Sequence, residues 1–450
     1  MRGAEILISE ALHLCQPSEN QERRIGAVAE EVKALVDRYV AQLDDVVDVV
    51  FGGSFAKGTW LPDHADVDIF VKIKPSVDIE KFEEIGRDIG IETLKEYGPM
   101  LRYSDHPYVE AFVKNVRVNV VPCYDVEQGK WKSAADRSPF HTQYIRTRFD
   151  DQKRGQARLL KKFLKTLGIY GAEVSIAGFS GYVSEVLILK YCSFQNVLQA
   201  AADWQEREVI AVTDYDSDFV KGFNSPVTII DPVDSRRNLG TAISPESVAK
   251  FILAARAFLE RPSLQFFKES KRQSAASRPL LPNVLVVEFS HKRKSPDVIW
   301  GQLKRSINSI AMQLELTHFS VLRSSCLTDE RNSAALVFLL ESITLPPYMK
   351  KKGPQIFRRK DAASFLSNRK KPLSIWVDRE MRVALLEKRK ATDARKFVKS
   401  LLLNDVEKSG VSRDLIVNKL QIYSGDDRKI KGIVKEAVGK VVSTEHIIFR

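Results

Sequence analysis

Residues 52–71 read GGSFAKGTWLPDHADVDIFV, in which a small-residue turn precedes two aspartates set in an apolar run. If the second half of this stretch is a strand, Asp66 and Asp68 project from one face, because strand residues alternate between faces. Val67, Ile69 and Val71 then enter a core. Neighbouring carboxylates repel each other, and burying them is costly unless a cation lies between them. Hard cations such as Mg²⁺ take oxygen ligands of this kind together with substrate phosphates.

The turn itself is suited to a phosphate. Gly52 and Gly53 let the backbone approach a phosphate closely, and N–H groups at the start of a helix hold its charge. We expect the Ser54 hydroxyl to hold a triphosphate and Lys57 to neutralise it. Alternatively, the segment is a polar turn with an N-cap serine, and the aspartates are solvated on an edge strand. Apolar alternation around the aspartates favours the first interpretation, a metal-dependent nucleotidyl transferase.

Length and composition indicate a multidomain globular protein. A chain of 450 residues is too long for one ordinary core, so two to four domains are expected. No apolar run reaches membrane-span length, and the N-terminus lacks a secretory layout. The four cysteines lie far apart without a CxxC pair, which argues against a structural zinc or disulfide framework and favours the cytoplasm. The net charge of +12 modestly favours a nucleic-acid partner.

The hydrophobic pattern predicts an α+β protein with an α/β head over residues 1–140. Its helices are expected at residues 20–44 and 78–97, and its strands at 46–51, 67–73, 108–113 and 116–121. A mainly helical domain is predicted for residues 141–262, with helices at 156–167 and 179–194.

A C-terminal region is predicted for residues 263–450. Near its start, KESKRQSAASRPLLP (residues 268–282) reads as a linker or an exposed basic loop. Strands at 284–289, 319–323 and 334–340 around a helix at 298–316 resemble half of a ferredoxin-like sheet, a layout often used on RNA. The tail from Asp393 onward is predicted to be mostly helical.

The spacing of Gly-Gly-Ser and Asp-Val-Asp resembles the signature of the DNA polymerase β-like nucleotidyltransferase superfamily. Further stretches, in this order, resemble the archaeal-type (class I) CCA-adding enzymes, which are tRNA nucleotidyltransferases: YSDHPYVEAFV, VNVVPCY, DRSPFH, LLKKFLKTLGIYGAE, GFSGYVSEVLI, DPVDSRRN and SLQFFK. The resemblance is strong over roughly residues 1–270 and weak through 353–367. It implies a polymerase β-like head, a helical central domain that contacts the nucleotide and selects the base, and an α+β tRNA-binding C-terminal region.

The resemblance also implies an activity and its partners. The family adds C, C and A to the 3′ end of tRNA from CTP and ATP without a template, releasing pyrophosphate. Two Mg²⁺ ions are expected, with Mn²⁺ as a substitute. The family's nucleotide-contacting positions match Gly53, Ser54, Lys57, His141, Lys161 and Tyr170, and an arginine implicated in base selection matches Arg237. Lys57 keeps the charge of a frequent arginine without its planar fork, and Asp66 replaces a frequent glutamate.

Without the resemblance, four of these residues have simpler interpretations. His141 fits a helix start satisfied by the backbone, and Lys161 fits a solvated helix face. Tyr170 fits a core position with a locally bonded hydroxyl. Arg237 fits a surface ion pair with Asp234.

Asn119 departs from the family pattern. The superfamily needs a third carboxylate on a neighbouring strand, and the matching strand reads Arg117-Val118-Asn119-Val120. An amide oxygen can ligate Mg²⁺ but brings no charge, and Arg117 on the same face is expected to weaken metal binding. Asp66, Asp68 and Asn119 remain the expected metal ligands and catalytic residues. A working natural variant, a change that slows catalysis and an inactive homologue stay open, and we favour an enzyme with weaker metal affinity and slower chemistry.

A basic segment, residues 350–371, carries nine Lys or Arg and one Asp, interleaved with Phe357 and Phe365. Phosphate contacts from such a segment would position RNA without reading its sequence; a solvated charge run is the alternative. Two rival functions remain: a poly(A) or uridylyl transferase of the same superfamily, and an RNA-binding pseudoenzyme. The sequence leaves the oligomeric state open, a homodimer included.

Overall fold

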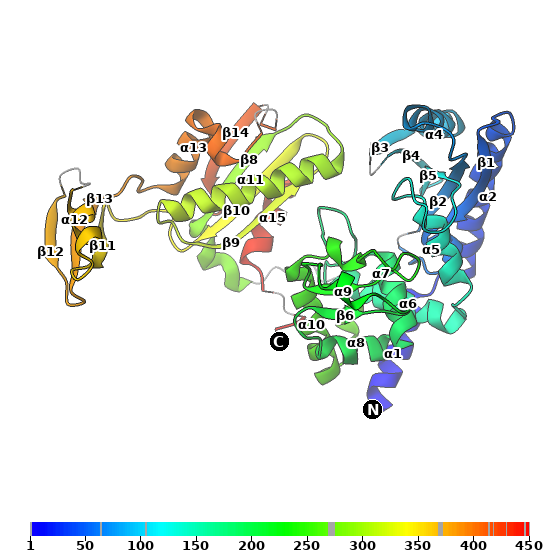
Figure 1. The fold of residues 1–450 in the computed structure, drawn as a ribbon, viewed down its shortest axis with the longest axis horizontal. Helices are drawn as coiled ribbons and strands as arrows, with labels where there is room; N and C mark the ends of the chain where they lie inside the picture. Colours follow the sequence, from blue (N-terminus) through cyan, green and yellow to red (C-terminus); the bar gives the residue numbers. More distant parts are fainter. Residues whose placement is uncertain are drawn as a thin grey trace. The chain divides into compact units, whose positions relative to one another are not determined.

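The computed structural model describes residues 2–63, 65–103, 106–268, 275–367, 372–412, 415–416, 418–428, 430–444 and 447–449. The chain forms two compact units, Met1–Lys271 with Glu445–Arg450, and Arg272–Thr444 (Figure 1). The predicted domain boundaries at residues 140 and 262 stay predictions. Within the described ranges, no helix combines the length and the apolarity that a membrane crossing requires.

The head of the first unit is a five-stranded sheet of order β1-β2-β5-β4-β3. The strands are β1 (Val46–Gly52), β2 (Asp66–Ile73), β3 (Met100–Tyr103), β4 (Pro107–Val113) and β5 (Val116–Tyr124). Strand β2 pairs antiparallel with β1 and parallel with β5. The two aspartates therefore lie on a central strand, and the edge-strand alternative is wrong.

One face of this sheet is covered by two helices, α2 (Glu19–Val40) and α4 (Ile79–Leu94). Val67, Ile69 and Val71 of β2 are fully buried in the core that the helices share with the sheet, as the alternation predicts. The opposite face is left to Asp66 and Asp68. The short helix α3 (Gly53–Lys57) follows β1 directly, and a 3₁₀ turn, η1 (Lys95–Tyr97), ends the second predicted helix.

The rest of the first unit is mainly helical, as predicted. Its helices are α1 (Arg2–Cys15), α5 (Arg137–Arg146), α6 (Asp151–Thr166), α7 (Gly181–Tyr191), α8 (Phe194–Ala202), α9 (Ser217–Val220) and α10 (Pro245–Glu260), with 3₁₀ turns η2 (Leu239–Ala242) and η3 (Leu264–Phe267). A small parallel sheet of β6 (Glu208–Ile210) and β7 (Val227–Ile229) was not predicted.

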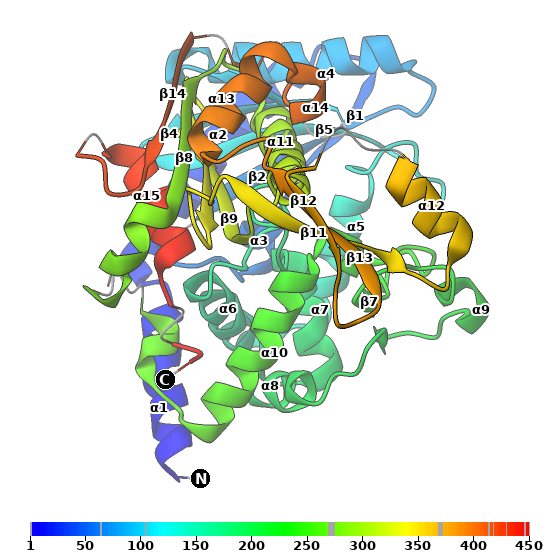
Figure 2. The same ribbon diagram turned by 90° about the vertical axis from the view of Figure 1, so that its left-hand side faces the viewer.

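Packed phenylalanines form the core of this helical part, and α1 packs along α6 beside it (Figure 2). Phe163 contacts the rings of Phe194, Phe258 and Phe266 with centroids 5.4–5.8 Å apart. Ile448, which follows the second unit in sequence, is buried in the same core. The chain therefore returns to the first unit after completing the second.

The second unit is built on an antiparallel sheet of order β14-β8-β10-β9. Its strands are β8 (Val284–Ser290), β9 (Val321–Thr328), β10 (Ser333–Leu340) and β14 (Asn418–Ser424), and its helices are α11 (Pro296–Leu316), α13 (Ala394–Asn404), α14 (Val406–Ser409) and α15 (Gly432–Val442). The order β8-α11-β9-β10-α13-β14 completes the ferredoxin-like arrangement, of which the sequence indicated half.

Three expectations for this unit need correction. Strand β9 begins at Val321, not Phe319, because the Phe319 N–H donates to the Leu314 carbonyl at the end of α11, and its side chain is fully buried there. The tail contains strand β14, so it is less helical than predicted. Part of the predicted linker forms a 3₁₀ helix, η4 (Ala275–Asn283), while residues 269–274 lie outside the described residues.

A small three-stranded sheet is inserted between β10 and α13. It has the order β11-β13-β12, with β11 (Tyr348–Gln355), β12 (Ser374–Val377), β13 (Arg382–Lys388) and the helix α12 (Arg359–Ser367). The predicted basic segment contributes β11 and α12, and its residues 368–371 lie outside the described residues. Lysines in β11 mask the strand pattern, so the sequence did not predict this sheet.

Candidate active site

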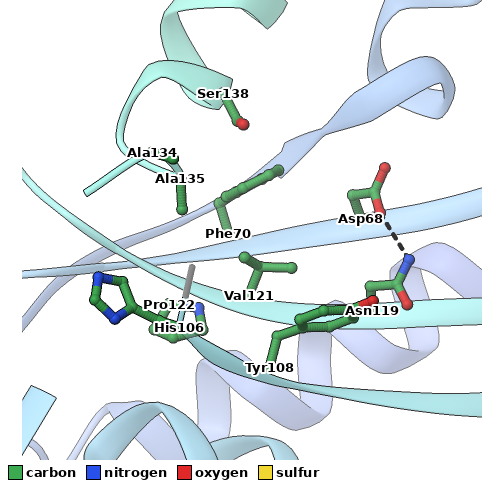
Figure 3. Close-up of a pocket in the computed structure, with 10 residues that line it drawn as sticks. All are labelled: Asp68, Phe70, His106, Tyr108, Asn119, Val121, Pro122, Ala134, Ala135 and Ser138. Atoms are coloured by element: carbon green, nitrogen blue, oxygen red, sulfur yellow. Dashed lines mark hydrogen bonds between the residues drawn. The ribbon is translucent and has the colours of Figure 1, made fainter. Parts of the chain in front are cut away.

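Strand pairing brings the two aspartates and the third predicted ligand into one row. Asp68 is the register partner of Gly52 on β1 and of Asn119 on β5, and Asp66 is the partner of Arg117. Figure 3 shows Asp68 and Asn119 side by side at one end of a cavity of about 290 Å³. The cavity is lined from β2, β4, β5, the segment before α5 and the first turn of α5, including Phe70, Tyr108, Val121 and Ser138.

The glycine turn lies directly against the carboxylate of Asp68. Gly53 has φ +62°, a left-handed conformation that favours glycine, and a Cβ at this position would overlap Asp68 Oδ2. The hydroxyl of Ser54, the next residue, has no hydrogen-bond partner in the described part of the chain. The turn that lies against Asp68 therefore carries a free hydroxyl.

Asp68 and Asn119 are joined through a hydrogen bond in which Asn119 Nδ2 donates to Asp68 Oδ1 at 2.8 Å. Burial raises the pKa of Asp68, and the negative charge of Asp66 raises it further. The hydrogen bond from Asn119 opposes this rise. The Oδ1 atom of Asn119 is buried without a hydrogen-bond partner in the described structure. An orphaned buried acceptor costs free energy, which a cation or a donor would recover.

These oxygens fit a hard divalent cation. Two carboxylates lie side by side, and an unpartnered amide oxygen lies in the next strand. Within the described residues, no three His, Cys, Asp or Glu side chains gather in a way that could hold a metal ion. The donor set is thus Asp66, Asp68 and the amide of Asn119, with one fewer charge than three carboxylates would give.

Arg117 occupies the other end of the row. Its Nε donates to Asp66 Oδ1 at 2.8 Å and its Nη2 donates to Asp66 Oδ2, which makes a bidentate ion pair. The expectation that Arg117 shares a face with Asn119 agrees with this contact. Asp66 is therefore neutralised by a residue of the protein itself.

A second group of predicted residues surrounds one buried carboxylate, Glu185 of α7. Its Oε2 accepts from Lys57 Nζ at 2.6 Å, and its Oε1 accepts from Lys161 Nζ at 2.7 Å and Thr59 Oγ1 at 2.5 Å. Burial alone would raise the pKa of Glu185, but the two ammonium groups outweigh it and hold the pKa at about 2. Burial lowers the pKa of Lys161 to about 8. Lys161 is fully buried, so its interpretation as a solvated lysine is wrong.

Tyr170 lies beside this group. A Cβ added at Gly181 would be 3.0 Å from the Tyr170 hydroxyl and 3.5 Å from Lys161 Nζ, so both polar tips face the start of α7. Burial raises the pKa of Tyr170. The tyrosine is therefore partly buried against the helical core, and its hydroxyl lies near the ammonium of Lys161.

A third group centres on Asp231. Its Oδ2 lies 2.9 Å from His141 Nε2 and accepts from Arg237 Nη1 at 3.3 Å, and its Oδ1 accepts from the Tyr182 hydroxyl at 3.1 Å. The His141 ring stacks on Tyr182 with centroids 3.9 Å apart. Burial lowers the pKa of His141, partly offset by Asp231. Arg237 is thus paired with Asp231, and Asp234 is paired with Arg137 instead.

The Glu185 group and the Asp231 group are connected through Tyr182, whose hydroxyl donates to Asp231. Lys57 Nζ lies 5.4 Å from the centre of the Tyr182 ring, within the range of a cation–π contact. Sequence reasoning did not select Glu185, Tyr182 or Asp231, although all three lie in the stretches that it quoted. A glutamate in the otherwise apolar run GYVSEVLILKY was the available signal for Glu185.

The Glu185 cluster predicts a large stability effect. Glu185→Gln leaves two buried ammonium groups without their counter-charge, so we expect it to lower the free energy of unfolding by roughly 3–5 kcal/mol. Because the folded pKa of Glu185 is held at about 2, below its ordinary 4.5, the unfolded chain binds more protons between these pH values. Wild-type stability should therefore fall as the pH drops from about 4.5 to about 2.

Urea unfolding followed by circular dichroism, repeated across this pH range, measures both effects. The variant should lose part of the pH slope as well as stability. Glu260→Gln, at an exposed position at the end of α10, is the matched control and should change neither. A Glu185→Gln variant as stable as that control would contradict the assignment.

Comparisons with known proteins cover most of the chain. The model of the nucleotidyltransferase domain family matches residues 33–144. Models of the second domain of tRNA nucleotidyltransferases and of the C-terminal domain of CCA-adding enzymes match residues 155–268 and 282–425.

Individual relatives agree with these models. A CCA-adding enzyme of Pyrobaculum neutrophilum is 36% identical over 365 residues, covering 79% of this chain and 84% of the relative. One from Saccharolobus shibatae is 34% identical over 400 residues, covering 88% and 92%. Among solved structures, the poly(U) polymerase Cid1 overlays with a TM-score of 0.48 at 15% identity, over 60% of this chain and 99% of Cid1, and this loose overlay carries no argument. Because these relatives are more than 30% identical to it over most of their length, the chain belongs to the CCA-adding enzyme family.

Proposed function

We propose that this chain adds C, C and A to the 3′ end of tRNA from CTP and ATP, without a template and with release of pyrophosphate. The observation that carries the proposal is the side-by-side placement of Asp66 and Asp68 on the central strand β2, against the Gly53 turn. In a member of the CCA-adding enzyme family, this row is where a nucleoside triphosphate would meet the RNA end.

The reaction places negative charge where the carboxylate row lies. The terminal ribose hydroxyl of the RNA loses its proton to solvent, and its oxygen forms a bond to the α-phosphorus. The bond from that phosphorus to the bridging oxygen breaks, and pyrophosphate leaves. Divalent ions, when bound, neutralise the charge on the phosphoryl oxygens and on the leaving pyrophosphate. Asp66, Asp68 and the Asn119 amide oxygen would hold Mg²⁺, or Mn²⁺ in its place, and two ions are proposed. Asn119 contributes a dipole here instead of a charge.

The nucleotide would lie along the turn and the two buried clusters. Gly53 has no side chain to block a phosphate, and the free hydroxyl of Ser54 can donate to a phosphate oxygen. Lys57 and Lys161 carry two positive charges against the single charge of Glu185, so this cluster keeps a net positive field beside the turn. Such a fixed charge needs no reorganisation when a triphosphate arrives.

Arg237 is the residue we assign to base selection. Its side chain is 40% exposed, and only one of its nitrogens, Nη1, bonds to the buried carboxylate of Asp231. The remaining N–H donors are held in a defined direction and can reach acceptors on a base. Asp231 and His141 would then act by positioning Arg237.

The small sheet of the second unit would hold RNA through residues 357–360, around the start of helix α12, more than through its strand β11. Lys350, Lys351 and Lys352 of β11 lie 3.3 Å from Asp378, 3.5 Å from Glu387 and 2.9 Å from Glu380. In contrast, Arg358, Arg359 and Lys360 are exposed, and the described residues offer them no ion pair. Phe357 beside them is 76% exposed, which suits stacking on a base.

Incorporation of labelled CTP and ATP into a tRNA without its CCA end tests the function. We expect this chain to add C, C and A and then stop, which separates it from a poly(A) or uridylyl transferase. Asn119→Asp should raise the rate about tenfold or more, because a full charge on the ligand adds over ~1.4 kcal/mol of transition-state stabilisation. Asn115→Asp, in the exposed turn before β5, is the control and should leave the rate unchanged.

The outcomes are distinct. Incorporation only by Asn119→Asp would mean that the substrate is right and that the amide cripples the site. Silence from both proteins, with tRNA still bound, would establish a pseudoenzyme and overturn the proposal.

Gly53→Ala tests the contact between the turn and Asp68. The substitution strains a positive φ, at a cost of about 1–2 kcal/mol, and its methyl group would push Asp68 aside. A displaced catalytic group costs about 100-fold in turnover or more. Gly98→Ala is the matched control, because Gly98 has φ +63° but no atom within 4 Å of the added Cβ. Thermal unfolding should show similar losses for both, while only Gly53→Ala loses CCA incorporation; equal turnover would contradict the role of the contact.

A pair of triple variants tests the RNA surface. Alanine at Arg358, Arg359 and Lys360 should weaken tRNA binding and reduce the slope of log affinity against log salt by about 2–3, since each phosphate contact contributes about 0.9. Alanine at Lys350, Lys351 and Lys352 should change the slope by less than about 1, because these lysines are already paired. Filter binding across a salt series measures both, and equal slopes for the two variants would refute the distinction.

A further inference from the structure

We propose that Arg117 is an internal counter-cation of the catalytic row, which a divalent metal must displace from Asp66, and that Glu110 receives the displaced guanidinium. The inference rests on the proposed function for its meaning, since it states how that site takes up its metal. It concerns two residues, Arg117 and Glu110, that lie outside the predicted ligand set.

The ion pair between Arg117 and Asp66 uses the whole carboxylate. The guanidinium donates from Nε and Nη2 to the two oxygens of Asp66, in the parallel bidentate geometry that arginine–carboxylate pairs favour. The pKa of Arg117 is raised, chiefly by this hydrogen bond and against the effect of burial. Arg117 therefore places a cation of the protein on the carboxylate that is proposed to hold a divalent ion.

The guanidinium and a metal ion cannot share Asp66 without conflict. A guanidinium has only donors, so it cannot ligate a metal, and its positive charge repels a dication at close range. The neighbouring Asn119 amide also faces its aspartate with a donor, because its NH₂ group points at Asp68 and its Oδ1 atom is left unpartnered. Loading the row with metal requires Arg117 to leave Asp66 and the amide oxygen of Asn119 to turn toward the ion.

Glu110 is placed to accept Arg117. It lies on β4 as the register partner of Asn119, and its side chain is only 6% exposed. Its Oε1 accepts from Arg102 at 3.1 and 2.7 Å, while its Oε2 lies 3.8 Å from Arg117 Nη1. Shortening that separation by about 1 Å gives a normal hydrogen bond. A small rotation of Arg117 would thus exchange one carboxylate for another.

This exchange has a consequence for metal uptake. Without metal, Asp66 is neutralised and the two adjacent aspartates do not repel each other with full force. Metal binding must replace that pairing, so the affinity of the row is lower than its carboxylates alone would give. Removing Arg117 should therefore tighten metal binding while weakening the metal-free fold.

Titration of the full-length protein with Mn²⁺, followed by electron paramagnetic resonance without RNA or nucleotide, tests the proposal. We expect Arg117→Met to raise the Mn²⁺ affinity at least tenfold. Its metal-free melting temperature should fall, and the rise in melting temperature on adding Mn²⁺ should exceed that of the wild type. Arg87→Met, an exposed arginine of α4 paired with Asp88, controls for net charge and should change neither quantity.

Glu110→Gln provides a second variant that leaves Arg117 in place. Without its receiving carboxylate, Arg117 should stay on Asp66, and Mn²⁺ affinity should fall several-fold. Glu92→Gln, an exposed carboxylate of α4, is its control and should bind Mn²⁺ like the wild type. Wild-type affinity in Arg117→Met, or equal shifts in a variant and its control, would overturn the proposal.

The two proposals fail separately in these experiments. Manganese binding is measured without tRNA, CTP or ATP, so unchanged affinity in Arg117→Met leaves CCA addition untouched. Conversely, a protein that adds no nucleotide can still show tighter Mn²⁺ binding in Arg117→Met. That pair of results would preserve the counter-cation and reject the function.

Discussion

Mutual repulsion between Asp66 and Asp68 is the constraint on which the site depends. The pair lies on a central strand between β1 and β5, and both residues are only partly exposed, so water screens their charges incompletely. Neighbouring residues offset this repulsion along the row. Arg117 pairs with Asp66, Asn119 donates to Asp68, and Gly53 leaves room for the Asp68 carboxylate against the turn. The same geometry that makes the row costly to fold makes it attractive to cations.

A single buried carboxylate orders the surroundings of the turn. Glu185 on α7 binds Lys57 at the end of α3, Thr59 just after it and Lys161 on α6, so three segments converge on one acceptor. Because such a charge is stable only with its partners in place, the cluster fixes the turn against the helices behind it. The position of the Ser54 hydroxyl is therefore coupled to a residue more than a hundred positions away in sequence.

Local sequence patterns predict much of the fold, but they do not predict which side chains pair with each other. Alternation around Asp66 was enough to predict β2 and its buried face, and the apolar run of α7 was enough to predict a buried helix. Strand β11 was missed because its lysines carry no alternation; their acidic partners lie 28 and more positions away in sequence. The partners of Lys161 and Arg237 could not be read from spacing either. The sequence placed one on a solvated face and the other beside Asp234, whereas folding gives them Glu185 and Asp231.

The burial of Ile448 among the phenylalanines of the first unit makes the second unit an insertion in the chain of the first. The first unit is thus encoded by two separated stretches of sequence, and its core is complete only when both are present. A fragment ended before residue 272 would keep every residue of the candidate site yet have a gap in its hydrophobic core. The catalytic half of this molecule is one body in space but two pieces in sequence.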